Sequence, residues 1–275
     1  MKKSFLAIAM LAALCTYAQL NTPITSPPAT ITQKVGIMEA KIEYNRPSAR
    51  GRKVFGDVVP FDQPWRTGAN APTKITFSDS VIIGGKKIAG GTYAFYTIPG
   101  QKEWTIILGK NPTKYAWDHK EEDDAVRFKV ASETLPYNVE SFTIEFANLG
   151  RFTADVVLKW ETTSVKFPIE NDGDKKIMAE IKSKIESVDL YWQSANYYFD
   201  NNKDLKQALE WINKVVEKNP QFWTYHAKAK IHSKLGDCKA AGEAAKRSTE
   251  LAKAAKNEEY VKMNEKLIAE CKSAK

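Results

Sequence analysis

Apolar and polar residues alternate along much of the first half of the chain, with the period of two that is typical of half-buried β-strands. Turn residues such as Gly84–Gly85 and Pro99–Gly100 separate these alternating segments at short intervals. The clearest alternating segments lie at residues 42–44, 128–130, 142–146 and 156–160. Since no helical pattern intervenes, the sequence predicts an antiparallel β-sandwich over residues 19–168.

The hydrophobic period becomes helical after a short polar segment, IENDGD, which we interpret as a linker at residues 169–174. Beyond it, Ile177, Ile181 and Ile185 recur at helical spacing, and proline is found only at Pro220. This pattern predicts an α-helical domain over residues 175–275. The chain is therefore expected to be of the α+β class, with two domains.

Two segments of the helical half resemble tetratricopeptide repeats. The first, residues 189–220, departs from the repeat at Asn196, where the family has glycine. A second, degenerate copy begins at Trp223, and a last capping helix is expected over residues 253–275. The repeat positions that carry the resemblance are Trp192, Ala195, Phe199, Ala208, Pro220, Ala229, Gly236, Asp237 and Ala241. The resemblance implies pairs of antiparallel helices that stack side by side.

The helical half is also rich in aromatic residues, which are enriched at protein interfaces. One interpretation is a protein or peptide partner that binds along the helical repeat. The other is packing of the repeats on the β domain. The residues concerned are Tyr197, Tyr198, Trp211, Trp223 and Tyr225.

The N-terminus has the pattern of a secretory signal peptide. Lys2 and Lys3 precede an apolar run from Phe5 to Leu14, and small residues follow up to Ala18. We expect cleavage after Ala18, so that residues 1–18 are removed and the mature protein is periplasmic or secreted. An alternative is a lipoprotein acylated on Cys15. The apolar run is too short to span a bilayer, which needs about 20 residues, and no later segment is apolar enough.

The net charge of the full chain is +8. Residues 19–168 carry 19 basic and 16 acidic side chains, and residues 169–275 carry 20 and 17. The two signs are interspersed in both halves, whereas nucleic-acid-binding proteins concentrate basic charge on one face. We therefore expect no nucleic-acid partner.

Two cysteines remain after removal of the leader, Cys238 and Cys271. In an oxidising compartment an even pair is a candidate disulfide. If the helices that carry them run antiparallel, the start of one lies beside the end of the other. Two unrelated thiols are the alternative.

The segment of residues 46–70 is rich in arginine, proline and glycine, which favours a long ordered loop rather than a helix or a central strand. In one interpretation, its arginines and neighbouring polar side chains converge on an anionic or sugar-like ligand, since arginine offers a planar fork of donors. In the other, the arginines pair with buried acids such as Asp57 and Asp62. The ligand-binding candidates are Arg46, Arg50, Arg52, Trp65, Arg66, Thr67 and Asn70.

This half of the chain resembles the bacterial family known as domain of unknown function 2911, common in secreted proteins of Bacteroidota. The resemblance covers about residues 30–169. It rests on RPSARGR at 46–52, WRTGAN at 65–70, Thr73, the run from Gly84 to Tyr93, and Trp104. The resemblance implies a secreted, mostly β domain that is sometimes followed by helical repeats, and it implies no established activity.

Other candidate chemistry is weak. The acidic run at residues 118–124 lacks the order of a calcium loop, and no nucleophile elbow, zinc pair or phosphate loop is present, so we expect no metal and no cofactor. We interpret the chain as a secreted, envelope-associated protein for non-catalytic binding or assembly. The alternative is a hydrolase or carbohydrate-active enzyme with its site in the loop of residues 46–70.

Overall fold

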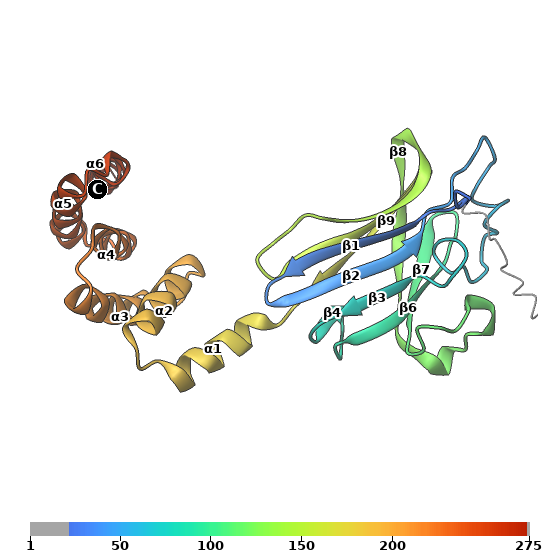
Figure 1. The fold of residues 1–275 in the computed structure, drawn as a ribbon, viewed down its shortest axis with the longest axis horizontal. Helices are drawn as coiled ribbons and strands as arrows, with labels where there is room; N and C mark the ends of the chain where they lie inside the picture. Colours follow the sequence, from blue (N-terminus) through green and yellow to red (C-terminus); the bar gives the residue numbers. More distant parts are fainter. Residues whose placement is uncertain (1–21, 274–275) are drawn as a thin grey trace, which may run out of the picture. The chain divides into compact units, whose positions relative to one another are not determined.

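The computed structural model describes residues 22–273. The expected leader, its cleavage site after Ala18, and Cys15 lie outside these residues. The chain divides into two compact units, a β unit that ends at Asp172 and a helical unit that begins at Gly173. Figure 1 shows the strands of the first unit and the helices of the second.

The β unit contains one antiparallel sheet with the strand order β1-β2-β3-β6-β7-β8-β9-β4-β5. Its longest strand, β8, pairs with β7 through its first third and with β9 through the rest. The antiparallel class expected from the sequence is confirmed. The strands are β1 (Pro28–Val35), β2 (Met38–Asn45), β3 (Lys74–Phe77), β4 (Val81–Ile83), β5 (Lys86–Ile88), β6 (Gly91–Ile98), β7 (Glu103–Gly109), β8 (Asp124–Ala147) and β9 (Thr153–Glu170).

The alternating side chains of these strands form one hydrophobic core. Ile42 on β2 lies opposite Ile75 on β3, and both are fully buried. Phe142 on β8 and Trp160 on β9 join the same core, although they belong to the other part of the sheet. The core therefore combines residues from strands on both sides of β6 and β7 in the strand order.

The linker is shorter than the sequence predicts. Ile169 and Glu170 belong to β9, where they pair with Ile83 and Ile82 of β4. Gly173 already begins the first helix. Sequence pattern placed Glu170 in the linker because it is polar, whereas its position in β9 is exposed and tolerates a polar side chain.

The helical unit contains six helices among the described residues. Neighbouring helices pack in the sequential pairs α2–α3, α3–α4, α4–α5 and α5–α6. No helix of residues 22–273 has the length and apolarity needed to cross a bilayer. The helices are α1 (Gly173–Lys184), α2 (Val188–Asp200), α3 (Leu205–Lys218), α4 (Phe222–Lys234), α5 (Cys238–Ala254) and α6 (Glu258–Ser273).

Helix boundaries follow side-chain caps rather than the expected bounds. Asp237 caps α5 by accepting from the backbone N–H of Ala240 at 3.0 Å. The last helix starts at Glu258 and not at Lys253, which belongs to α5. Asn257 accepts from the backbone N–H of Tyr260 at 3.2 Å and so acts as the start signal of α6.

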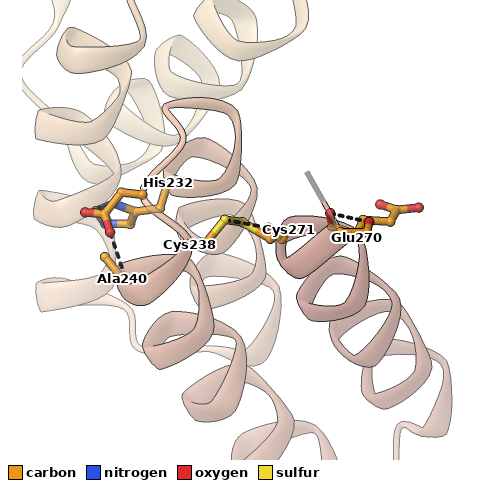
Figure 2. Close-up of a disulfide and its surroundings, with 7 residues drawn as sticks. His232, Cys238, Ala240, Glu270 and Cys271 are labelled. Atoms are coloured by element: carbon orange, nitrogen blue, oxygen red, sulfur yellow. Dashed lines mark hydrogen bonds and ion pairs between the residues drawn. A yellow bond between two sulfur atoms is a disulfide. The ribbon is translucent and has the colours of Figure 1, made fainter. Parts of the chain in front are cut away.

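A disulfide joins Cys238, the first residue of α5, to Cys271 near the end of α6 (Figure 2). The Cα atoms of the two cysteines are 5.6 Å apart. This separation is ordinary for a disulfide. The geometry is the one expected of two antiparallel neighbouring helices, in which the start of one lies beside the end of the other.

A chain of buried polar groups crosses the interior of the helical unit. His226 Nδ1 on α4 lies 2.7 Å from Asn264 Oδ1 on α6. Asn264 donates to the hydroxyl of Ser248 at 2.8 Å, and that hydroxyl donates to the carbonyl of Phe222 at 2.7 Å. These buried side chains satisfy one another's hydrogen-bonding groups, and so they link α4, α5 and α6.

The helical unit is expected to lose stability as the pH falls below about 6.5. Burial lowers the pKa of His226 and also that of His232. In the unfolded chain both imidazoles take up a proton near their ordinary pKa. In the folded chain they take up a proton only at lower pH. The contribution of each is therefore fully present above the unfolded pKa and declines towards the folded pKa, by at most about 1.4 kcal/mol per pH unit.

Urea denaturation of the full chain, followed by circular dichroism at 222 nm from pH 7.5 to pH 5.5, measures this decline. The double variant His226→Gln, His232→Gln is the control, since it lacks both imidazoles and should show a flatter profile. Equal slopes for the wild type and the double variant would contradict the assignment.

Candidate functional site

The segment of residues 46–70 is tied to the sheet by backbone hydrogen bonds at several points. Trp65 and Thr97 exchange backbone hydrogen bonds at 2.7 and 3.0 Å. The backbone N–H of Ala49 donates to the carbonyl of Glu140 at 2.8 Å, and Ser48 bridges to Ser141. The segment is therefore a shaped loop with a fixed path, as its sequence predicts.

Four residues of this loop other than glycine have a positive φ: Arg50, Asp62, Thr67 and Asn70, with values from 53° to 58°. The left-handed region is unfavourable for a β-branched residue such as Thr67. Thr67 is nevertheless fully buried, and its carbonyl accepts from the hydroxyl of Thr73 at 2.7 Å. Such conformations persist where the surroundings enforce them, and they cluster at ligand sites.

Trp65 anchors the loop in the aromatic part of the core. Its ring lies against that of Trp160 with centroids 5.9 Å apart, and it meets Phe142 edge-on at 5.0 Å. Its indole N–H donates to the carbonyl of Gly68 at 3.0 Å. Because ring packing and this hydrogen bond hold Trp65 in place, the backbone of the neighbouring Arg66 is also held in place.

An open cleft of about 600 Å³ lies over this loop. Three of the predicted arginines line it, together with Trp65 and several hydroxyl-bearing residues. The lining residues are Thr25, Ser26, Pro47, Ser48, Arg50, Arg52, Val58, Val59, Trp65, Arg66, Gly68, Ala69 and Trp160. We call this feature the arginine cleft.

Two of the three arginines of the cleft donate to backbone carbonyls rather than to acids. Arg52 donates to the carbonyls of Ala49 and Ser48, each at 3.0 Å, and Arg50 donates to that of Thr25 at 3.2 Å. Arg66 Nε is buried and has no hydrogen-bond partner. Carbonyl groups carry no net charge, and no guanidinium of these three arginines forms an ion pair with a carboxylate among the described residues.

The interpretation in which these arginines pair with buried acids is therefore wrong for Asp57 and Asp62. Both aspartates are exposed, and neither forms an ion pair with an arginine of the loop. The nearest acidic contact is Glu140, whose carboxylate accepts from the backbone N–H of Arg50 at 2.7 Å. Glu140 does not line the cleft.

Three of the seven predicted ligand-binding residues do not line the cleft. Arg46 donates to the carbonyl of Phe142 at 3.1 Å and to the hydroxyl of Thr143 at 2.8 Å, which fastens the loop to β8. Thr67 is buried, and Asn70 is exposed and donates to the carbonyl of Ser26 at 3.4 Å. These side chains shape the loop, whereas Arg50, Arg52, Trp65 and Arg66 face the cleft.

The hydroxyl groups on the cleft wall were not among the predicted ligand-binding residues. Thr25 and Ser26 precede the first strand and have no motif of their own. Ser48 lies inside RPSARGR, and its hydroxyl is 2.8 Å from that of Ser141. Only its position between Arg46 and Arg50 could have singled it out.

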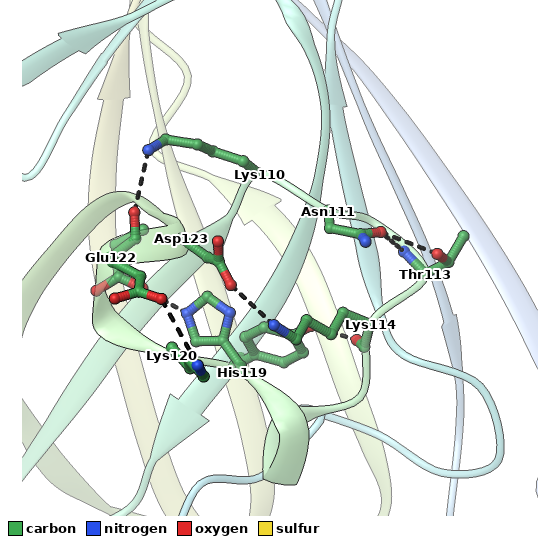
Figure 3. Close-up of polar contacts among 10 residues, drawn as sticks. Lys110, Asn111, Thr113, Lys114, His119, Lys120, Glu122 and Asp123 are labelled. Atoms are coloured by element: carbon green, nitrogen blue, oxygen red, sulfur yellow. Dashed lines mark hydrogen bonds and ion pairs between the residues drawn. The ribbon is translucent and has the colours of Figure 1, made fainter.

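The acidic run at residues 118–124 is paired with bases (Figure 3). Asp123 binds Lys114 at 2.8 Å, and Asp124 accepts from Arg127 at 2.6 Å and lies 2.5 Å from His119 Nε2. No group of three histidine, cysteine or acidic side chains suited to a metal occurs in the part of the chain that the structure describes. The run therefore fastens the loop after β7 to the start of β8.

Tyr96 lies on β6 and contacts the same loop through its side chain. Its hydroxyl donates to the carbonyl of Lys114, and its ring lies 4.9 Å from that of His119. Burial, together with the negative charges of Asp118 and Asp123, raises the pKa of Tyr96 to about 12. The phenol therefore stays protonated at neutral pH and remains a hydrogen-bond donor.

The helical unit has a separate groove of about 500 Å³, lined by residues of α2, α4 and α6. The ammonium groups of Lys230 and Lys234 lie 4.8 and 4.5 Å from the ring centroid of Phe199, which borders this groove. Trp211 is buried, with its ring against Tyr198 at 4.6 Å, so part of the aromatic excess is core. A protein or peptide partner in this groove stays a prediction.

Comparison with known proteins places the first half of the chain in one family. Searches of curated proteins and of solved structures found no significant match. The model of a family described as "Protein of unknown function (DUF2911)" matches residues 26–169. The matched range holds the whole arginine cleft apart from Thr25 and ends one residue before β9 does. Because the match covers more than half of the chain, the protein belongs to the DUF2911 family.

Proposed function

We propose that the protein is a non-catalytic binding protein of the cell envelope, whose β unit captures an anionic ligand in the arginine cleft. One observation carries this proposal. Arg50, Arg52 and Arg66 line the same open cleft, and none of their guanidinium groups forms an ion pair with a carboxylate among the described residues. A guanidinium binds a carboxylate or phosphate through paired hydrogen bonds, which supplies both energy and orientation.

The buried Nε of Arg66 supports an anion as the ligand. A buried donor that lacks a partner costs about 1–3 kcal/mol, and a native structure that retains one needs a reason for it. An anion that reached the guanidinium of Arg66 would supply the missing acceptor. The loop would then be shaped in advance for the ligand, because Thr67 and Trp65 on either side of Arg66 are already fixed.

The lining of the cleft supports binding over the alternative, a hydrolase or carbohydrate-active enzyme. General acid–base catalysis needs a titratable group within hydrogen-bond reach of the substrate. Among the described residues that line the cleft, none is an aspartate, glutamate, histidine or cysteine. Ser48 is present, but its hydroxyl contacts that of Ser141 rather than a base.

The expected site of action rests on the sequence. A signal peptide at residues 1–18 would deliver the protein to the periplasm or the exterior. A disulfide between Cys238 and Cys271 fits a compartment outside the cytoplasm. The membership of the first half in DUF2911 fits both, since the resemblance implies secreted proteins.

Binding of simple anions tests the proposal. We expect the chain from Gln19 onwards to bind inorganic phosphate and citrate, as measured by isothermal titration calorimetry at low ionic strength. The variant Arg66→Gln should weaken both affinities about tenfold or more, because a hydrogen bond to a charged group contributes about 1.5–3 kcal/mol. Arg52→Gln should weaken them in the same direction.

Lys86→Gln is the matched control, since Lys86 is an exposed cation on β5 outside the cleft. It should change either affinity by less than about twofold. Because Arg66 forms no ion pair, Arg66→Gln and Lys86→Gln should melt within a few degrees of each other. A wild-type protein that binds neither anion, or an Arg66→Gln variant that binds both normally, would overturn the proposed function.

A further inference from the structure

An aromatic ring stands beside the arginine cleft with most of its surface in solvent. Trp117 is 62% exposed, the largest fraction among the exposed large apolar residues of the described chain. The ring of Tyr115 is stacked on it, with centroids 4.5 Å apart and planes inclined by 17°. A tryptophan ring that is exposed to this extent offers a flat apolar surface with a polar N–H at its edge.

The loop that carries Trp117 is firmly anchored on both sides of the ring. The preceding residue, Ala116, is buried in a small cluster with Tyr96 and Ile107. The carbonyl of Lys114 accepts from the Tyr96 hydroxyl, and His119 contacts Asp124. Lys114 and His119 are labelled in Figure 3. The loop that exposes Trp117 is therefore held in place on both sides of the ring.

Arg66 connects this ring to the cleft. Its guanidinium carbon lies 5.8 Å from the centroid of the Trp117 ring, and the same side chain lines the arginine cleft. A ligand whose anionic group reaches Arg66 would consequently bring its neighbouring atoms to the exposed surface of Trp117. Arg66 therefore lines the cleft and also lies over the ring of Trp117, although Trp117 itself does not line the cleft.

We propose that Trp117 is a stacking surface for a sugar ring, so that the ligand of the arginine cleft is a uronate-bearing oligosaccharide. This proposal rests on the proposed function and names its ligand class. One face of a pyranose ring presents C–H groups and packs on a flat aromatic surface, while its hydroxyls point outwards at the edge. The carboxylate of the uronate would meet Arg66.

The wall of the cleft suits the remaining groups of such a ligand. Thr25, Ser26 and Ser48 offer hydroxyls that both donate and accept, as sugar hydroxyls require. Arg50 and Arg52 offer cationic donors to further carboxylates along the chain of the oligosaccharide. A nucleotide also combines a flat ring with an anion, and it is therefore the competing ligand class in the test.

The test compares ligands that share only part of this chemistry. Trigalacturonate is the probe, with galactotriose as the neutral sugar, citrate as the anion without a sugar ring, and adenosine monophosphate as the nucleotide. We expect trigalacturonate to bind at least tenfold more tightly than the other three to the chain from Gln19 onwards. Binding should also change the fluorescence of the exposed tryptophan.

Two variants separate stacking from charge. Trp117→Ala should weaken the affinity for trigalacturonate about tenfold and change the affinity for inorganic phosphate by less than about twofold. Trp117→Phe should restore part of the lost affinity for trigalacturonate. Tyr137→Ala is the matched control, because Tyr137 is an aromatic residue of β8 that is 52% exposed and does not line the cleft. It should leave both affinities unchanged.

Each other outcome has a defined meaning. Normal trigalacturonate binding by Trp117→Ala would overturn the stacking proposal, as would tighter Trp117-dependent binding of adenosine monophosphate. If phosphate binds through the arginines but trigalacturonate binds no more tightly than citrate, only the sugar proposal fails. If the wild type binds neither phosphate nor citrate, the proposed function itself fails.

Discussion

Loss of the disulfide between Cys238 and Cys271 is expected to lower the free energy of unfolding of the helical unit by about 3–4 kcal/mol. The bond closes a loop with a sequence separation of 33 residues and thereby restricts the unfolded chain. The helical unit needs this constraint because its core around the bond consists largely of small side chains, such as Ala241, Ala244 and Ala245. Small side chains bury little apolar surface per residue.

The double variant Cys238→Ala, Cys271→Ala measures this contribution. Its urea denaturation, followed at 222 nm, should resemble that of the reduced wild type, and reductant should not change it further. Thiol titration of the denatured, unreduced chain from Gln19 onwards should find no reactive thiol. Two thiols per chain in protein recovered from the periplasm would show that the bond does not form in the native compartment.

The sequence predicted the β unit well because alternation and burial are coupled along a strand. The alternating residues Phe142, Ile144 and Phe146 lie on β8, and the first two are buried as their period requires. Turn position was equally readable at Gly84–Gly85, where a two-residue hairpin joins β4 to β5. Strand ends were less readable, since polar Glu170 continues β9 on its exposed side.

The partners of the loop arginines could not be read from the sequence. Asp57 and Asp62 are close to the arginines along the chain. Sequence proximity does not determine where side chains point, however, in a loop with four left-handed residues other than glycine. The acceptors proved to be backbone carbonyls, which every residue carries and which leave no trace in the sequence. Arg46 was grouped with the cleft for the same reason, although it points to β8.

The stacking role that we propose for Trp117 was not predicted, because neither neighbour in sequence points to it. The proposal depends on Arg66, which is about 50 residues away along the chain, and on the burial of Ala116. The acidic run that follows attracted attention as a metal candidate instead. Its function in the fold is to hold the loop that displays the ring.

Substitution of Gly84 by alanine is expected to destabilise the β unit by about 2–5 kcal/mol, the combined cost of an unfavourable φ and of overpacking. Gly84 has a φ of 56°, and a Cβ atom there would lie 2.3 Å from Cδ1 of Phe128 on β8. The Phe128 ring cannot easily retreat, because it packs edge-on against the ring of Phe167 with centroids 5.5 Å apart. The hairpin between β4 and β5 would have to shift away from the core.

Gly85 provides the matched control within the same turn. Its φ is 74°, but a Cβ atom there would have no neighbour within 4 Å. Gly85→Ala should therefore cost only the backbone term, about 1–2 kcal/mol. Hydrogen exchange of peptides from β4, β5 and β9 in increasing urea reports on the β unit alone. Equal losses for the two variants would mean that backbone conformation, and not the close approach of Phe128, makes glycine necessary at position 84.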